Sequence, residues 1–187
     1  MAAGLVAGGA GYIGSHMAQA LLDAGREVVV LDNLATGHRD LVPAGARFVQ
    51  GDLGCERVLE SMFCSYRIDA AMHFAACSLV GESVADPLKY YDNNVARTVT
   101  LLRAMLRHGV RRLVFSSTAA VYGEPQRTPI RESDPVRPTN PYGASKAAVE
   151  RMLADCDRAH GLRYASLRYF NAAGADPEAR RGERHDP

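Results

Sequence analysis

The stretch LVAGGAGYIG, residues 5–14, decides the expected fold. In it a short apolar run leads directly into three glycines at three-residue spacing, Gly8, Gly11 and Gly14. A strand that turns tightly into a helix needs glycine in the turn, and backbone without side chains lets a phosphate reach the N–H groups at the helix N-terminus. Three glycines can also form an ordinary turn. Their position between an apolar run and a helical segment favours a loop that binds the phosphates of a dinucleotide.

Outward from this loop, short apolar or β-branched runs alternate with longer helical segments. We expect strands at Leu5–Ala7, Glu27–Leu31, Arg47–Val49, Asp69–Phe74, Arg112–Ser116 and Tyr164–Arg168. We expect helices at Gly14–Ala24, Tyr90–His108 and Tyr142–His160, each followed directly by a glycine. This alternation is typical of an α/β fold in which helices connect the strands of a parallel sheet.

Composition excludes several classes of protein. The 187 residues carry a formal net charge of +1 and are 47% hydrophobic, which is unlike a disordered chain or a polybasic nucleic-acid binder. No uncharged apolar run approaches about 18 residues, and the N-terminus lacks the basic region of a secretory signal. We therefore expect a cytoplasmic protein of one domain, or one domain plus a fragment, with neither a membrane nor a nucleic acid as partner.

The cysteines give no sign of a disulfide framework or a metal site. Cys55, Cys64, Cys77 and Cys156 contain no C-x-x-C pair and are scattered through the chain. A chain of this length does not need disulfides to stabilise its core. We expect four free thiols and no bound metal.

An acidic residue follows the second expected strand, where a dinucleotide fold places the ligand of the adenosine ribose. Asp32 lies 18 residues after Gly14, and a carboxylate there accepts hydrogen bonds from the ribose hydroxyls. It also repels a 2′-phosphate, so NAD is favoured over NADP. Alternatively, Asp32–Asn33 is turn chemistry after a strand. Asp52, after the third strand, is a second candidate, for contact with the adenine.

A serine and threonine run and a Tyr-x-x-x-Lys motif form the candidate catalytic group. Ser116, Ser117 and Thr118 end the fifth strand, whereas Tyr142 and Lys146 lie four residues apart on one face of an expected helix. An ammonium beside a phenol stabilises the phenolate, so we expect the pKa of Tyr142 to be lowered toward neutrality. Tyr142 can then exchange a proton with a substrate hydroxyl, and Thr118 can hydrogen-bond the same oxygen.

The alternative for the Tyr-x-x-x-Lys motif is an ordinary exposed helix pair. Composition favours catalysis, because 20 of the 22 basic residues are arginine and only Lys89 and Lys146 are lysine. A lysine kept four residues after a tyrosine, in a chain that otherwise uses arginine, indicates that arginine cannot replace it. For Ser116 and Ser117 the alternative is a turn at the end of the strand.

Together these motifs resemble those of the extended short-chain dehydrogenase/reductases. Five further stretches are similar to the UDP-glucose 4-epimerase family among them: His73–Ala76, Val80–Ser83, Tyr90–Val95, Asn140–Gly143 and Leu167–Asn171. The resemblance runs from the glycine loop to the last residue. It implies a Rossmann-type, doubly wound parallel sheet with helices on both faces, NAD as cofactor and a UDP-hexose as substrate.

The resemblance implies a role for each matching residue. The phenolate of Tyr142 takes the proton of the sugar 4-hydroxyl while the C4 hydride passes to NAD, and the transient 4-keto sugar accepts the hydride on its other face. Lys146 binds the nicotinamide ribose, whereas His73 only packs in its strand. The implied cofactor-binding residues are Gly8, Gly11, Tyr12, Ile13, Gly14, Asp32, Asn33, Asp52, Leu53, Phe74, Ala75, Ala76, Asn93, Ser116, Tyr142, Lys146 and Tyr169. The implied substrate contacts are Thr118, Tyr142 and Asn171.

The resemblance also divides the chain. Residues 1–174 correspond to the NAD-binding domain, incomplete at its C-terminal edge, and residues 175–187 form a polar tail at the start of a missing substrate-binding region. The two long helices, Tyr90–His108 and Tyr142–His160, resemble a pair that forms a dimer interface in this family. A homodimer is therefore expected.

Two alternatives remain open. Without the substrate-binding part, the chain can be an NAD-binding module that lacks activity, because its substrate would face water. A nucleotide-sugar 4,6-dehydratase has the same fold, but it needs an acid and a base after the threonine, where this chain has Ala119 and Ala120. One departure from the family, Ala96–Arg97 in place of Asn-Gly, has no assigned effect.

Overall fold

The centre of the computed structural model, which describes residues 2–178 and 180–184, is a six-stranded parallel sheet. The strands are β1 (Ala3–Ala7), β2 (Glu27–Asp32), β3 (Arg47–Gln50), β4 (Ile68–His73), β5 (Arg112–Ser116) and β6 (Arg163–Leu167). Their order is β3-β2-β1-β4-β5-β6, so the winding direction reverses between β1 and β4. In open α/β sheets such a reversal creates a crevice at the carboxyl ends of the strands, and ligands bind there.

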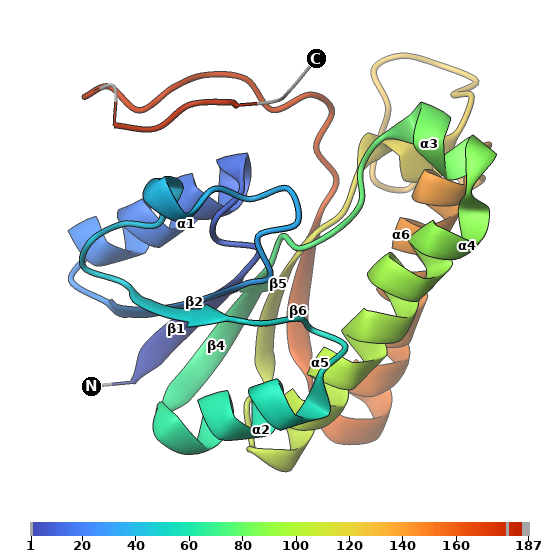
Figure 1. Cartoon of the computed structure of the whole chain (residues 1–187). Helices are drawn as coiled ribbons and strands as arrows, with labels where there is room; N and C mark the ends of the chain where they lie inside the picture. The colour runs from blue at the N-terminus through green and yellow to red at the C-terminus, as the bar shows by residue number, and fades with distance from the viewer. Residues whose placement is uncertain (1, 179, 185–187) are drawn as a thin grey trace.

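Helices cover both faces of the sheet, as Figure 1 shows. The α-helices are α1 (Tyr12–Asp23), α2 (Glu56–Ser65), α3 (Val80–Ala85), α4 (Pro87–Tyr90), α5 (Arg97–Arg107) and α6 (Pro141–His160). Three short pieces are η1 (Arg39–Leu41), η2 (Tyr91–Ala96) and η3 (Ala119–Tyr122). α1 packs on one face of the sheet, whereas α2, α5 and α6 pack on the other. The expected Rossmann-type, doubly wound parallel sheet is confirmed.

The alternation of side chains along the strands builds two separate cores. Val6 belongs to the core under α1, together with Ala18 of that helix. Its neighbour Leu5 belongs to the larger core on the opposite face, with Leu59 of α2 and Leu153 of α6. Successive residues of a strand point to opposite faces, and a parallel sheet buried on both faces therefore needs uninterrupted apolar strands.

The expected strands all form, within two residues of the expected ends. Among the expected helices, Gly14–Ala24 corresponds to α1 and Tyr142–His160 to α6. The helices α2 and α3 were not expected. No helix in residues 2–178 and 180–184 is long and apolar enough to cross a membrane.

The expected single helix over Tyr90–His108 is instead three consecutive pieces. α4 ends at Tyr90, η2 is one turn of π-helix, and α5 begins at Arg97. A π-turn inserts one residue into the helical repeat and thereby redirects its side chains, and such turns are frequent at functional sites. Here Asn94 is turned into the interior and is 2% exposed.

The described part of the C-terminal segment lies on the side of the molecule that carries α1 (Figure 1). Its contacts are polar: the Arg181 Nε donates to the carbonyl of Leu41 at 3.2 Å, and Arg184 pairs with Asp40 at 2.8 Å. Residues 179 and 185–187, which belong to the expected tail, lie outside the described residues.

Candidate functional site

The residues expected to bind the cofactor gather at the carboxyl edge of the sheet. The glycine loop follows β1, Asp32 ends β2, residues 52–53 follow β3, and residues 74–76 follow β4. Ser116 ends β5, and Tyr169 follows β6. Because all six strands are parallel, their carboxyl ends meet along one line, and chain segments far apart in sequence are brought together there.

The glycine loop is closed by contacts that exclude any side chain. Gly8 has φ +80° and donates its N–H to the carbonyl of Leu31 at 2.8 Å. A Cβ on Gly8 would lie 2.5 Å from the backbone nitrogen of Ala75, and one on Gly14 would lie 2.1 Å from the Gly8 carbonyl oxygen. Both positions therefore require glycine: Gly14 lets α1 pack against the glycine loop, and Gly8 lets the backbone after β4 approach that loop.

The N-terminus of α1 is built to receive an anion. Gly11 is its N-cap residue, and within the described residues no side chain caps the helix and no acidic residue occupies its first turn. A Cβ on Gly11 would have only the Gly8 carbonyl oxygen within 4 Å, at 3.5 Å, among the described atoms. There is thus room beside Gly11, next to the first N–H groups and the positive end of the helix dipole. This cradle fits a dinucleotide pyrophosphate.

Asp32 is held in place by the loop beside it. One carboxylate oxygen accepts from the Ala10 N–H and the other from the Leu34 N–H, both at 2.9 Å. These bonds fix the orientation of the carboxylate next to the glycine loop.

Asp52, the candidate adenine contact, has an unexpected partner. Asn33 donates to it at 2.8 Å, the Gly54 N–H donates at 2.7 Å, and the guanidinium of Arg97 forms an ion pair with it. Arg97 also pairs with Asp92 at 3.2 Å, and these side chains line an opening of about 450 Å³. Arg97 was noted in the sequence only as a departure from the family; here it fixes the orientation of Asp52.

The candidate catalytic residues lie together near the end of β5. Tyr142 and Lys146 occupy successive turns of α6, and a hydrogen bond joins the side chains of Tyr142 and Thr118. Lys146 is 3% exposed, and its Nζ donates to the carbonyl of Ser116 at 2.8 Å. The same Nζ lies 5.9 Å from the centre of the Tyr142 ring. The sequence motif is therefore no exposed helix pair.

Burial sets the protonation of these two groups. Desolvation lowers the pKa of Lys146 from 10.5 to about 7, because an ammonium is poorly solvated in the interior. Desolvation raises the pKa of Tyr142, although the hydrogen bond with Thr118 acts in the opposite direction. The expectation that Lys146 lowers the pKa of Tyr142 is wrong for this structure, because burial acts on both groups.

A chain of buried hydrogen bonds positions the start of α6. His73 bonds the Thr98 hydroxyl at 2.8 Å, and that hydroxyl donates to the carbonyl of Asn94 at 2.6 Å. The Asn94 side chain donates to the Ser145 hydroxyl at 3.0 Å, which donates to the carbonyl of Tyr142 at 2.7 Å. Because Thr98 donates to Asn94, it must accept from His73, so the His73 Nε2 carries a proton. The sequence assigned His73 to packing alone, and it is indeed buried.

The remaining expected residues are placed less tightly. Asn93, in η2, donates to the side chain of Asn94 at 3.0 Å. The carbonyl of Tyr169 accepts from the Ala119 N–H at 2.7 Å, which links the end of β6 to η3. Asn171, expected to contact the substrate, is exposed, as is its neighbour Phe170.

Replacing Lys146 by methionine should stabilise the fold at neutral and acidic pH. Below pH 7 the buried ammonium opposes folding fully, and this cost disappears between pH 7 and 10.5, where the unfolded chain binds a proton that the folded chain does not. The free energy of unfolding should rise on the order of a few kcal/mol at pH 6, reduced by the loss of the hydrogen bond to Ser116. This gain should shrink as pH rises. Urea unfolding at several pH values measures it. An exposed control, Lys89→Met, should show no such trend between pH 6 and 9, and a pH-independent difference for Lys146→Met would contradict the prediction.

The chain is similar to known proteins in sequence and in structure. The model of the NAD dependent epimerase/dehydratase family matches residues 4–186. The UDP-glucose 4-epimerase of Streptomyces lividans is 58% identical over 186 residues, and that of Halalkalibacterium halodurans is 56% identical over 183 residues. Both alignments cover 98% of this chain, but only 55% and 54% of the respective relatives.

Solved structures agree with the sequence relatives. The crystal structure of UDP-glucose 4-epimerase from Brucella ovis in complex with NAD matches with a TM-score of 0.97 at 49% identity, over 100% of this chain and 57% of that one. The epimerase from Bifidobacterium longum in complex with NAD+ and UDP matches with a TM-score of 0.93 at 39% identity, over 97% and 57%. The chain thus spans a little over half the length of these relatives, and it belongs to the NAD dependent epimerase/dehydratase family.

Proposed function

We propose that this chain provides the cofactor site and the proton-transfer residues for NAD-dependent epimerisation at C4 of a UDP-hexose, through a transient 4-keto sugar. One observation carries the proposal: Tyr142, hydrogen-bonded to Thr118 and one turn from the buried Lys146, lies at the same sheet edge as the open glycine cradle. Relatives named UDP-glucose 4-epimerase support the choice of reaction.

The residues divide the work. The N–H groups at the start of α1 would hold the pyrophosphate, Asp32 would bind the adenosine ribose, and Asp52, oriented by Arg97, would contact the adenine. Bound NAD supplies the hydride acceptor and donor for C4. Tyr142 moves the proton of the sugar 4-hydroxyl, and Thr118 hydrogen-bonds near that oxygen.

Lys146 has two duties in this proposal. Its ammonium would bind the nicotinamide ribose. Burial outweighs any effect of Lys146 on the pKa of Tyr142 in the chain alone, but a fully protonated Lys146, 5.9 Å from the Tyr142 ring centre, would oppose that rise. With a pKa of about 7, Lys146 is close to half protonated at neutral pH. A bound dinucleotide, which brings negative phosphates into the cleft, favours the protonated form.

Cofactor choice follows from Asp32. We expect the chain to bind NAD about 100-fold more tightly than NADP. The fixed Asp32 carboxylate would repel the 2′-phosphate of NADP at close range. Titration of both dinucleotides, followed by quenching of tyrosine fluorescence, measures the ratio. Asp32→Ser should reduce the preference; equal affinities in the unaltered chain would exclude this role for Asp32.

A homodimer through α5 and α6 is part of the proposal. A largely apolar groove of about 280 Å³ lies between these helices. It is lined by Val99, Leu102, Arg103, Leu106, Met152, Asp155, Cys156 and His160. The expected partner is the same groove of a second copy, because dimers bury one self-complementary patch.

Leu106→Arg should shift the chain from dimer to monomer, because it places a charge in the centre of the apolar groove. Sedimentation velocity at micromolar concentration measures the shift. Leu88→Arg, at an exposed position of α4, is the matched control. A monomeric unaltered chain contradicts the dimer.

The proposed function is tested by measuring turnover of UDP-galactose by the chain without added NAD. The absorbance of cofactor released on denaturation measures how much NAD the chain has bound. Turnover would support the epimerase function. Bound NAD without turnover would indicate that the chain is a cofactor-binding module that lacks activity. Formation of a 4-keto-6-deoxy sugar would indicate a dehydratase, which Ala119 and Ala120 disfavour, because neither can carry a proton.

The four free cysteines agree with a place in the reducing cytoplasm.

A further inference from the structure

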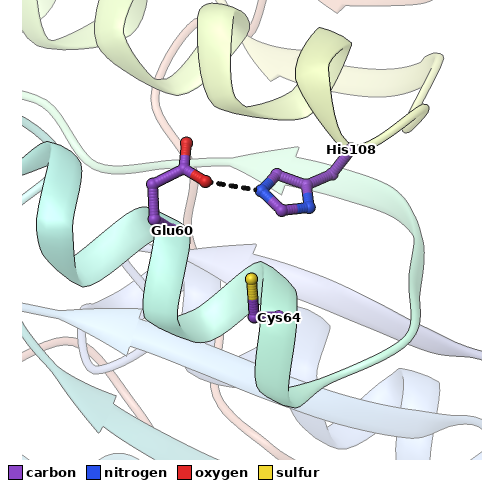
Figure 2. Close-up of side chains that lie close together, drawn as sticks. All are labelled: Glu60, Cys64 and His108. Atoms are coloured by element: carbon purple, nitrogen blue, oxygen red, sulfur yellow. Dashed lines mark hydrogen bonds and ion pairs between the residues drawn. The ribbon is translucent and has the colours of Figure 1, made fainter.

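Three potential metal ligands meet on the face of the molecule away from the glycine loop. Glu60 and Cys64 lie one turn apart on α2, and His108 follows directly after α5. Their ligand atoms, a carboxylate oxygen, the thiol sulfur and an imidazole nitrogen, all lie within 4.8 Å of one another. Figure 2 shows the Cys64 sulfur on the side of α2 that faces the imidazole ring.

Neighbouring residues fix the orientation of two of these ligands. The His108 ring stacks on Phe63 with centres 5.3 Å apart and planes inclined by 14°, and its Nε2 lies 2.8 Å from the Glu60 Oε2. Arg107 pairs with the other oxygen, Oε1, at 2.5 Å. It therefore acts as an outer partner that orients the carboxylate, and Oε2, which His108 contacts, is the oxygen available to a metal.

We propose that Glu60, Cys64 and His108 bind a divalent zinc ion. Sulfur, nitrogen and oxygen donors in one set match the ligands that zinc accepts, and a thiolate with an imidazole disfavours magnesium and calcium. Around a tetrahedral ion with bonds of about 2.0–2.3 Å, ligand atoms lie roughly 3.3–3.8 Å apart. The widest spacing, up to 4.8 Å, must therefore close by about 1 Å, whereas the Glu60 Oε2 and His108 Nε2, now 2.8 Å apart, must separate slightly.

Binding requires a balanced exchange of protons. The thiol of Cys64 loses its proton to solvent and binds as thiolate, whereas the Nε2 of His108 must be unprotonated and gives up its bond to Glu60. Water completes the coordination. Each bound ion releases at least one proton, so affinity rises with pH.

The ion would add a link between two segments that already meet through side-chain packing and the Arg107–Glu60 ion pair. α2 lies just before β4 in the chain, and His108 is followed by Gly109 and Val110 and then by β5. Zinc therefore ties the helix before one strand to the turn before the next, and stabilises the fold by mass action. This site is independent of NAD binding and of turnover.

Cobalt(II) titration of the reduced chain tests the proposal directly. We expect a near-ultraviolet thiolate-to-cobalt absorption that is displaced by one equivalent of zinc, and a rise in the melting temperature with zinc. Cys64→Ser and His108→Gln should each weaken zinc binding by about 100-fold or more, since loss of an outer-shell partner alone costs about 10–100-fold. Competition with a chromophoric chelator measures these affinities.

Matched variants separate the site from other thiols and imidazoles. Cys156→Ala and His160→Gln, on α6, should leave the absorption and the affinity unchanged. Cys64→His should keep zinc binding but lose the thiolate absorption. No thiolate absorption in the unaltered chain, or the same absorption in Cys64→Ser, would overturn the proposal.

Discussion

Replacing Tyr142 by phenylalanine should lower turnover of UDP-galactose on the order of 10²–10⁴-fold while bound NAD is retained. The phenol is the group that takes the proton from the 4-hydroxyl, and phenylalanine keeps the ring but not the acid. The ring packs edge-on against Tyr90, with centres 6.4 Å apart, and this contact survives the substitution. Initial rates in a coupled assay measure the loss, and absorbance of released cofactor measures occupancy.

The matched control is Tyr91→Phe. Tyr91 is a neighbouring tyrosine of η2, largely exposed, with no place in the proposed proton transfer. It should retain nearly full turnover. Unchanged turnover in Tyr142→Phe would remove Tyr142 from the mechanism, whereas loss of both turnover and cofactor would show a structural effect instead.

Gly14→Ala should destabilise the fold by more than about 4 kcal/mol and abolish cofactor binding. The added Cβ would lie 2.1 Å from the Gly8 carbonyl oxygen and 2.9 Å from the Gly9 Cα, and both atoms are backbone. No side-chain rotation relieves this overlap, so the start of α1 must move away from β1. That movement separates the N–H groups of the helix from the phosphate position. Urea unfolding and cofactor content measure both effects.

Gly81→Ala provides the comparison for this substitution. Gly81 lies in α3, and a Cβ there would meet none of the described atoms within 4 Å. Alanine in a helix with free space around it should be neutral or slightly stabilising. If Gly14→Ala behaved like Gly81→Ala, the close packing of the glycine loop would not matter for folding.

The strands of this protein were predictable because each is an apolar run bounded by polar or glycine residues. Helix α2 also has a signal in the sequence, since Leu59, Met62 and Phe63 recur at helical spacing, and all three are buried. The π-turn of η2 has no such signal. Asn94 within it is hydrogen-bonded to Ser145, which lies 51 residues away and is brought close only by folding.

The candidate site was predictable as a set of residues but not in its electrostatics. Parallel strands bring the motif residues to one edge, so strand order alone gathers them. The direction of the Tyr142 pKa shift depends on burial, which the motif does not contain. The pairing of Arg97 with Asp52, and of Glu60 with His108, joins residues 45 and 48 positions apart that only the folded chain brings together.

The central position of β1 determines when a growing chain can first bind a nucleotide. The carbonyl of Ala7 accepts from the N–H groups of Phe74 and Ala75, and Gly8 is bonded to Leu31 on its other side. During synthesis β1 is made first, but the glycine loop after it is hydrogen-bonded on both sides only once β4 has been made. Until residue 75 has left the ribosome, the apolar β1 lacks one of its two neighbouring strands. During that time chaperones that recognise extended apolar segments can bind β1.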